Sequence, residues 1–317
     1  MKKIELVTAV PKELEGKRLD LVLSKIFPQY SRSKIQSWIK AGEVAVNDSK
    51  YKQRNAVNRG DVIKINTTLK NIIKDQAEPI ELNVIHQDNE IILINKPAGL
   101  VVHPGAGNKE HTLVNALLNF DKKLGGLPRA GIIHRLDKDT TGIMIIARTI
   151  NSHTFLVREL QNRNIKRNYR AIISGRLVAG GTIENKIGRH PTRRTKMAVT
   201  SKGKSATTHY RIVKKYQHYT HVDVQLDTGR THQIRVHMNS INHPVIGDPL
   251  YGKNTTVKKG INTALRECVE NFKRQALHAN NLEFIHPQKG KMVSYKAELP
   301  DDMNKLIKTL EMNDKKN

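Results

Sequence analysis

The stretch Gly131-Ile132-Ile133-His134-Arg135-Leu136-Asp137-Lys138-Asp139-Thr140-Thr141-Gly142 is the densest group of ionisable side chains in the sequence. The apolar pair Ile132-Ile133 precedes its charged residues, and the apolar run Ile143–Ala147, which has the length of a strand, follows the stretch. The pattern predicts a polar loop between two strands, closed by a glycine. Charged side chains in a loop at the mouth of a sheet are typical of catalytic sites, and a surface loop with local salt bridges is the alternative.

Two better-known motifs do not fit the sequence. The order His134-Arg135-Leu136-Asp137 differs from the His-Arg-Asp of a kinase catalytic loop, and no glycine-rich loop precedes it. Gly203-Lys204-Ser205 resembles the end of a phosphate-binding loop, but Ala198 stands where the first glycine is required. His232 and His237 lie in a predicted strand and would point to opposite faces, so we expect no metal site.

The composition favours a polyanionic partner. The 317 residues include 55 Lys and Arg against 29 Asp and Glu, a formal net charge of +26. Neutralising phosphates releases condensed counterions, so such a surface binds nucleic acid regardless of sequence; a merely soluble basic surface is the alternative. We expect no signal peptide, because Glu5 stands where its apolar region should begin. No apolar run reaches the ~18 residues of a membrane span, and Cys268 is the single cysteine. We therefore expect a cytoplasmic protein without membrane association.

Residues 1–70 predict a small domain of two helices followed by short strands. Apolar residues at helical spacing predict the first helix over 18–27, and Ser31 is a favoured cap for the second. Gly42 fits the left-handed position just past the second helix. The free face of this helix carries Arg32, Ser33, Lys34 and Lys40.

This segment resembles the αL RNA-binding domain found in a small-subunit ribosomal protein. The resemblance rests on the strings 31–36 and 42–47 and covers about sixty residues. It implies that the face formed by Arg32, Ser33, Lys34 and Lys40 binds RNA, and a solvated helix face is the alternative.

The rest of the chain predicts an α+β fold. Residues 66–80 indicate a linker, and residues 80–300 contain short apolar strand candidates separated by turn residues. Helical stretches are expected at 111–118, 151–161 and 264–274, without the regular alternation of a doubly wound sheet. Residues 301–317 predict a helix with a polar tail.

The loop and several later stretches resemble the Rlu family of ribosomal large-subunit pseudouridine synthases. The signature is 134–142, where Thr141 replaces the serine of many members. The other matching stretches, in the family's order, are Asn95–Gly99, Lys166–Ala171, Thr228–His237, His243–Gly252 and Leu277–Ala279. The resemblance implies a pseudouridine synthase fold, with a mixed, largely antiparallel sheet and a central cleft, in residues 80–300.

The resemblance also implies an activity, the isomerisation of uridine to pseudouridine in structured RNA, with no cofactor and no metal. Asp137 would be the carboxylate at the ribose, either a nucleophile at C1′ or a base on the 2′-hydrogen, and both roles stay open. Asp139 is its rival within the loop. Arg235, with Arg230 in reserve, would hold Asp137, because a guanidinium grips a carboxylate bidentately.

The remaining assignments concern the RNA. Tyr169 would stack on the uracil, and Arg135 would enter the stack that the flipped nucleotide leaves. His134 and Arg230 would also contact the RNA. We expect a monomer acting on large-subunit ribosomal RNA or its assembly precursor. The alternatives are transfer RNA as substrate, a non-catalytic RNA-binding factor, and a glycosylase that releases free uracil.

Overall fold

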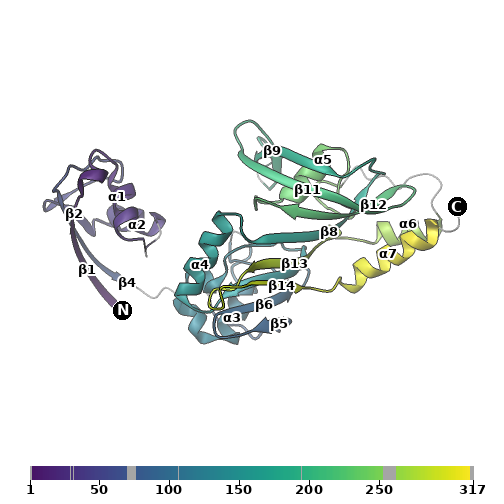
Figure 1. The fold of residues 1–317 in the computed structure, drawn as a ribbon, viewed down its shortest axis with the longest axis horizontal. Coiled ribbons are helices and arrows are strands. Elements are labelled where there is room, and N and C mark those ends of the chain that lie inside the picture. The colour runs from purple at the N-terminus through teal and green to yellow at the C-terminus, as the bar shows by residue number, and fades with distance from the viewer. Residues whose placement is uncertain are drawn as a thin grey trace. The chain divides into compact units, whose positions relative to one another are not determined.

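The computed structural model describes residues 2–28, 30, 32–69, 76–105, 107–193, 195–252 and 262–314, without the side chains of residues 2, 3, 33, 68 and 69. The chain forms two compact units, residues 1–73 (unit 1) and residues 74–317 (unit 2), each with its own hydrophobic core (Figure 1). The predicted cap Ser31 and the last three residues of the predicted polar tail lie outside the described residues.

Unit 1 consists of a small antiparallel sheet and two helices. Its elements are β1 (Lys2–Ala9), the 3-10 turn η1 (Lys12–Leu14), α1 (Leu19–Ile26), α2 (Arg32–Ala41), β2 (Val44–Val46), β3 (Ser49–Lys50) and β4 (Val62–Leu69). The strand order is β1-β4-β2-β3. Both predicted helices are present, and Gly42 has the expected left-handed φ of 74° directly after α2.

The core of unit 1 lies between the helices and the sheet. Its buried side chains include Leu19, Val22 and Leu23 of α1, Ile35, Trp38 and Ile39 of α2, and Val44, Val46, Ile63 and Ile65 of the strands. Spacings of three and four residues on the helices, and of two on the strands, place each set on one face. The same spacings made these elements predictable from the sequence.

Strand β4 is longer than the sequence indicates. A linker was expected to begin at residue 66, but pairing with β1 continues from Val62 to Leu69, so residues 66–69 belong to the sheet. The residues of this part are polar, so the sequence pattern does not indicate a strand here. In the structure, Thr67 is nevertheless buried, and its hydroxyl donates to Glu43 at 2.8 Å. Residues 70–75 of the predicted linker lie outside the described residues.

Unit 2 is built on one large mixed sheet. Its strands are β5 (Val84–Gln87), β6 (Ile91–Lys96), β7 (Thr141–Ala147), β8 (Lys166–Ser174), β9 (Gly181–Arg189), β10 (Met197–Val199), β11 (Lys204–Lys215), β12 (Tyr219–Leu226), β13 (Leu277–Ile285) and β14 (Met292–Lys296). The order is β10-β9-β11-β12-β8-β13-β7-β6-β5, with β14 paired to β13. In the described part of this sheet, β13 and β7 run parallel and the other paired strands run antiparallel. The predicted α+β class and the largely antiparallel sheet are confirmed.

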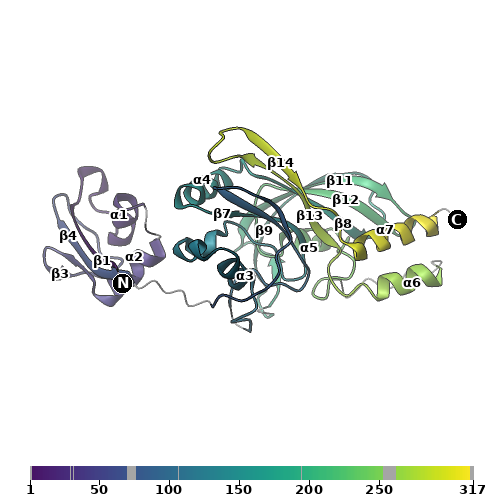
Figure 2. The same cartoon turned by 90° about the horizontal axis from the view of Figure 1, so that it is seen from below.

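Helices lie at several places along this sheet. They are α3 (Leu113–Phe120), α4 (Ile150–Gln161), α5 (Gln233–Ser240), α6 (Thr263–Glu270) and α7 (Asp301–Asp314), with 3-10 turns η2 (Lys122–Gly126) and η3 (Pro128–Gly131). α4 contacts β7, α5 contacts β9, β10 and β11, and α6 packs beside α7 (Figures 1 and 2). The predicted helices at 111–118, 151–161 and 264–274 correspond to α3, α4 and α6, with ends that differ by up to four residues.

The strand predicted through His232 and His237 is wrong, because this segment is helical. α5 begins at Gln233, and His232 precedes it in the left-handed conformation with a φ of 56°. Residues 233–238 alternate between polar and apolar types, which mimics a strand. All six are buried in the structure, so the helix has no solvent face over this stretch to reveal its period.

The glycine that closes the polar loop marks a close approach of two strands. β7 begins with Thr141 and Gly142, which pair with His278 and Ala279 of β13. Gly142 has a φ of 119°, and a Cβ there would lie 2.2 Å from the carbonyl oxygen of Ala279. The start of β7 therefore requires a residue without a side chain.

Candidate active site

The polar loop at 131–140 joins η3 to β7 and is fixed from behind. Lys96, fully buried at the end of β6, donates from Nζ to the carbonyls of Pro97, Leu100 and Lys138 at 2.7 to 2.9 Å. Burial lowers the pKa of Lys96 to about 7, against the attraction of the nearby Asp139 and Asp137. Lys96 therefore connects the loop to the sheet.

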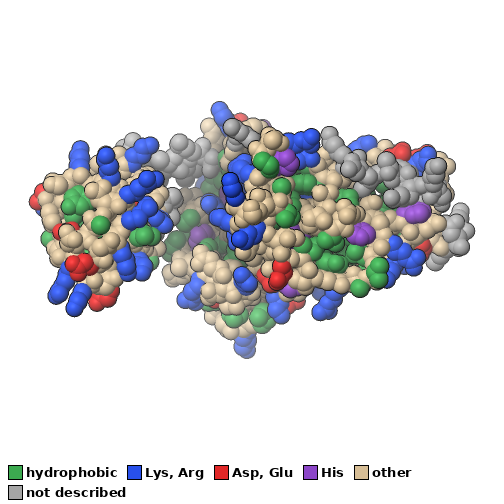
Figure 3. All heavy atoms as spheres, turned by 90° about the horizontal axis from the view of Figure 1, so that it is seen from above, with side chains coloured by type: hydrophobic (Ala, Val, Ile, Leu, Met, Phe, Trp, Pro, Cys, Tyr) green, Lys and Arg blue, Asp and Glu red, His purple; other side chains and the backbone are tan. Residues whose placement is uncertain are grey.

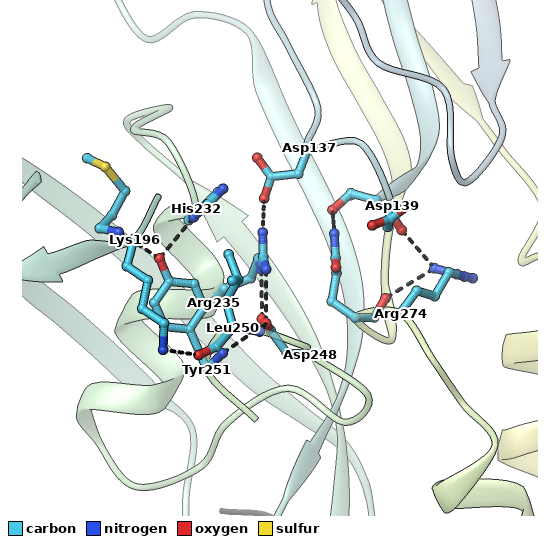
Figure 4. A network of polar contacts seen from close by, with 12 residues as sticks. Asp137, Asp139, Lys196, His232, Arg235, Asp248, Leu250, Tyr251 and Arg274 are labelled. Carbon is cyan, nitrogen blue, oxygen red and sulfur yellow. Dashed lines mark hydrogen bonds and ion pairs between the residues drawn. The ribbon is translucent and has the colours of Figure 1, made fainter. Parts of the chain in front are cut away.

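Arg235 on α5 binds two carboxylates. Its Nη1 donates to Oδ2 of Asp137 at 2.9 Å, and its Nε and Nη2 donate to the two oxygens of Asp248 at 2.7 and 2.9 Å (Figure 4). Burial opposes the charge of this guanidinium, but the bonds with Asp248 and Asp137 outweigh it and raise the pKa of Arg235. The permanently charged Arg235 holds Asp137 in a set orientation.

Asp248 and Tyr251 bring the segment 243–252 to the same place. Oδ1 of Asp248 also accepts the amides of Leu250 and Tyr251, at 2.9 and 3.1 Å. The Tyr251 ring lies 5.2 Å from the Arg235 guanidinium, and its hydroxyl is 2.9 Å from Nδ1 of His232 (Figure 4). The arrangement supports Arg235 from the side opposite to Asp137.

A cleft of about 800 Å³ opens at Asp137. Six residues singled out in the sequence line it: His134, Arg135, Asp137, Tyr169, Arg230 and Arg235. They come from the polar loop, from β8, and from the segment that leads into α5. The fold thus brings together side chains that lie about a hundred residues apart in the sequence.

Tyr169 lies on β8 and is buried. Burial raises the pKa of its hydroxyl, with Arg167 opposing and Asp137 adding to the shift. The phenol is therefore neutral around pH 7 and offers a ring face and an O–H group to the cleft, not a base.

The basic residues of the cleft differ in exposure. Arg135 and Arg230 are exposed, and Nε of Arg230 donates to the carbonyl of Ser205 at 3.2 Å. His134 is half-buried, and its Nε2 accepts the amide of Ile145 at 3.1 Å. The two arginines are accessible to RNA phosphates, whereas His134 is tied to β7.

Asp139, the rival of Asp137, does not line the cleft. Its carbonyl accepts Nη1 of Arg274 at 3.3 Å, and Arg274 forms a bidentate pair with Asp302 at the start of α7. The two aspartates of the loop are thereby separated, with Asp137 at the cleft and Asp139 toward Lys96 and Arg274 (Figure 4).

The predicted RNA-binding face of α2 belongs to unit 1. Arg32 donates to the buried Asp20 at 2.7 Å, so this arginine also joins α2 to α1. Lys34 lies over the Trp38 ring, 5.7 Å from its centre, and Lys40 is exposed. The side chain of Ser33 lies outside the described residues.

Several residues of this site have no assigned role in the sequence interpretation. Lys96 and Asp248 both lie in stretches that match the family, but nothing local indicates which atoms they bind. His103 and Arg167 also line the cleft. For Arg167 a signal exists, because it stands two residues before Tyr169 on a strand and therefore on the same face.

Neither a metal centre nor a membrane span is found in the described part of the chain. There, no group of three or more His, Cys, Asp or Glu side chains is placed to hold a metal ion. His237 instead bonds to Thr208 at 2.9 Å. No described helix is both long enough and apolar enough to cross a bilayer.

Comparison with known proteins identifies the family. The family model for RNA pseudouridylate synthase matches residues 90–240, and the model for the S4 domain matches residues 17–63. The chain belongs to the RNA pseudouridylate synthase family, and it carries an S4 domain in unit 1.

Curated bacterial relatives resemble the chain over nearly its whole length. Ribosomal large subunit pseudouridine synthase D of Haemophilus influenzae is 48% identical over 311 residues, covering 98% of this chain and 96% of the relative. The protein of the same name from Escherichia coli is 45% identical, covering 97% and 95%. Among solved structures, human RNA pseudouridylate synthase domain containing 4 shares the fold, with a TM-score of 0.57 and 23% identity over 72% of this chain and 93% of the human chain.

Proposed function

We propose that this protein isomerises uridine to pseudouridine in large-subunit ribosomal RNA, with Asp137 as the reacting carboxylate. The observation that carries the proposal is the 2.9 Å ion pair between Asp137 and Arg235 at a cleft that Tyr169 also lines. The names of the bacterial relatives, at 44 to 48% identity, support ribosomal RNA as the substrate.

The chemistry follows from the position of Asp137. Its carboxylate is 17% exposed and meets the cleft, so a ribose placed there is within reach. The carboxylate either attacks C1′ or takes the 2′-proton, and in both routes the C1′–N1 bond breaks and C5 of the uracil later joins C1′. Arg235 keeps the carboxylate oriented until the ribose arrives.

The RNA contacts are proposed from exposure and charge. The target nucleotide is flipped out of its stack, at a cost of a few kcal/mol, because the base cannot rotate inside a helix. Arg135, exposed beside Asp137, takes the vacated place, and Tyr169 stacks on the base. Arg230 and His134 contact the RNA around the flipped nucleotide.

The S4 domain supplies a second RNA contact. We assign it to the α2 face with Arg32, Ser33, Lys34 and Lys40, in a domain of residues 1–70 joined to a catalytic domain of residues 80–300. We also propose that the protein acts as a monomer. Since the relatives are bacterial and bacterial ribosomes assemble in the cytoplasm, we place the protein there.

The test compares pseudouridine in ribosomal RNA from cells that lack this gene and from cells complemented with variants. Wild type should restore the missing sites, and Asp137→Asn should not, because an amide can neither attack C1′ nor accept the 2′-proton. Chemical mapping of pseudouridine along the large-subunit RNA is the measurement.

Asp139→Asn is the matched control. It removes the same charge from a side chain that lies two residues further along the loop and outside the cleft. It should restore the same sites as wild type. Isomerisation by Asp137→Asn would refute the assigned role. Release of free uracil by the purified wild-type protein would instead make it a glycosylase, and lost sites confined to transfer RNA would change the substrate.

A further inference from the structure

Three residues that line the cleft each have a buried side-chain nitrogen without a hydrogen-bond partner. These atoms are Nε of Arg167, Nδ1 of His134 and Nε2 of His103, three of eight such side-chain atoms in the described part of the chain. Buried polar atoms are nearly always bonded, because an unpaired one costs about 1–3 kcal/mol. Their presence in one cleft indicates a place where a ligand supplies the missing partners.

Arg167 is the strongest of the three. It precedes Tyr169 by two positions on β8, so both side chains lie on one face of the strand. The residue is only 7% exposed, and its Nη2 makes a long contact of 3.4 Å with the carbonyl of Leu226. Among the described residues, no carboxylate lies within ion-pair distance of this guanidinium. A buried cation of this kind awaits an anionic or strongly polar partner.

His134 provides a second donor beside Arg167. Its Nε2 accepts the amide of Ile145, so in the neutral ring the proton is on Nδ1, the atom without a partner. Burial, together with the charge of Arg167, lowers the pKa of His134 to about 3. At neutral pH the cleft therefore presents an uncharged N–H group next to a cation.

We propose that Arg167 and His134 bind the carbonyl oxygens of the flipped uracil, and that Arg167 stabilises the negative charge of the detached base. This inference rests on the proposed function and adds two substrate-binding residues to it. Tyr169 covers the ring plane, while the two donors hold its edge.

The path of the charge explains why two arginines are needed. When C1′–N1 breaks, its electron pair stays on N1 and spreads to O2 and O4 of the uracil. Asp137 loses its own charge at that step, whether it has bonded to C1′ or taken the 2′-proton. When C5 bonds to C1′ the charge returns to Asp137, because its bond to C1′ breaks or its proton goes back to C2′; C5 then loses its proton and N1 gains one.

Arg235 and Arg167 therefore serve the two ends of this path. Arg235 binds the carboxylate when the charge is on Asp137, and Arg167 binds the base when the charge is on the uracil. A preorganised cation next to a developing anion is most effective in a cleft from which water is excluded.

The test measures the rate of pseudouridine formation and the affinity for RNA separately in the variant Arg167→Gln. Single-turnover pseudouridine formation at saturating protein should be about 100-fold slower than in wild type, the usual effect of removing one donor from a developing anion. The Kd for the same RNA should stay within about threefold, because a buried residue adds little to phosphate binding. Arg167→Lys keeps the charge and should recover most of the rate.

Two further variants complete the design. Arg170→Gln removes an equal charge from the opposite face of β8, where Arg170 pairs with Asp223 at 3.2 Å, and should leave the rate unchanged. Gly229→Ala keeps Arg167 but displaces it, because a Cβ at this position would lie 2.7 Å from its Nη1. This variant should also slow turnover without weakening binding, and it remains informative if Arg167→Gln does not fold.

Other outcomes overturn the inference. A rise in Kd with an unchanged single-turnover rate would make Arg167 a phosphate contact, and an unchanged rate and Kd would make it structural. If wild type itself forms no pseudouridine in ribosomal RNA, the proposed function fails first, and the comparison of variants does not arise.

Discussion

Asp137 and Asp248 share Arg235, but their surroundings differ. Asp248 is fully buried and accepts hydrogen bonds from two nitrogens of Arg235 and from two backbone amides. Asp137 accepts one nitrogen of Arg235 and remains partly exposed to the cleft. Asp248 therefore fixes the cation, and Asp137 keeps part of its carboxylate open to the cleft.

Asp248→Asn should lower both stability and activity. The change leaves the buried Arg235 with half of its compensating charge, and breaking such a pair costs about 3 kcal/mol or more. Arg235 would also turn toward Asp137 and bind both of its oxygens, which would block the oxygen that we propose to react with the ribose. Thermal unfolding and single-turnover rates of the purified protein are the measurements.

Asp223→Asn is the control, because Asp223 pairs with Arg170 near the surface, with exposed fractions of 50% and 37%. Exposed pairs contribute less than about 1 kcal/mol, so this variant should resemble wild type. Equal stability and rate for Asp248→Asn and Asp223→Asn would show that Asp248 does not support the site.

At the scale of elements, α1 and α2 are joined by a buried carboxylate. Asp20 of α1 accepts Gln36 and Arg32 of α2, and Arg18 just before α1. Burial raises the pKa of Asp20, but the hydrogen bonds from Gln36, Arg18 and Arg32 outweigh it and lower the pKa to about 2. The S4 domain thus depends on a charge that lies beneath its predicted RNA-binding face.

The pH dependence follows from this lowered pKa. Because the folded value is below the ordinary value of 3.8, the ionised carboxylate stabilises unit 1 above about pH 4, and this contribution is lost as the pH falls toward 2. The contribution is about 1–2 kcal/mol, since both arginines are nearly half exposed and water screens them.

Asp20→Asn should therefore destabilise unit 1 at pH 7, and the difference from wild type should fall to about half at pH 3. Trp38 is the only tryptophan of the chain and lies in the core of unit 1, so its fluorescence during urea unfolding reports on this unit. Asp48→Asn, which breaks an exposed pair with Lys64, should have little effect at either pH. A pH-independent difference for Asp20→Asn would contradict the linkage.

Helices with a clear solvent face and the continuous apolar run of β7 could be predicted from the sequence, whereas the buried segment of mixed polarity in α5 could not. α1 and α2 show the helical period plainly because one face of each is apolar. β7 is recognisable as an unbroken apolar run because the strand is wholly buried. α5 is buried around its whole circumference over residues 233–238, so its pattern gives the wrong period. The sequence predicts too short a strand at β4 because the last residues of this strand are polar.

The same limit applies to the site. The loop residues around Asp137 are visible as a local cluster, and the resemblance singled out Arg235 over Arg230. Lys96 binds the carbonyl of Lys138, 42 residues away, and Asp248 binds Arg235, 13 residues away. No local sequence pattern encodes such contacts. Arg167 stands two residues before Tyr169, but in a basic chain this spacing alone does not single it out, and its burial is known only from the structure.

At the scale of the whole molecule, positive charge is widespread. Lys and Arg side chains are scattered over the face shown in Figure 3, with few Asp and Glu between them. Residues 1–73 contain 15 Lys and Arg against 7 Asp and Glu, so unit 1 carries part of the excess and unit 2 the rest. Both units are therefore expected to release counterions from RNA.

Removing residues 1–73 should weaken RNA binding by about tenfold and reduce the slope of log Kd against log salt by about 2, equivalent to two or three phosphate contacts. Titrations of full-length and shortened protein with a large-subunit RNA fragment, from about 50 to about 200 mM salt, measure both quantities. An identical slope for the two proteins would mean that unit 1 makes no phosphate contacts.

The residues that hold the polar loop of the cleft in place lie far apart in the chain. Lys96 stands at one end of this set, and Asp302, which holds Arg274 behind the loop, stands at the other. During translation, residues near 302 leave the ribosome about 200 residues after Lys96. A nascent chain therefore gains the support of Arg274 and Asp302 for its polar loop only after residue 302 has been made, long after the strand that carries Lys96.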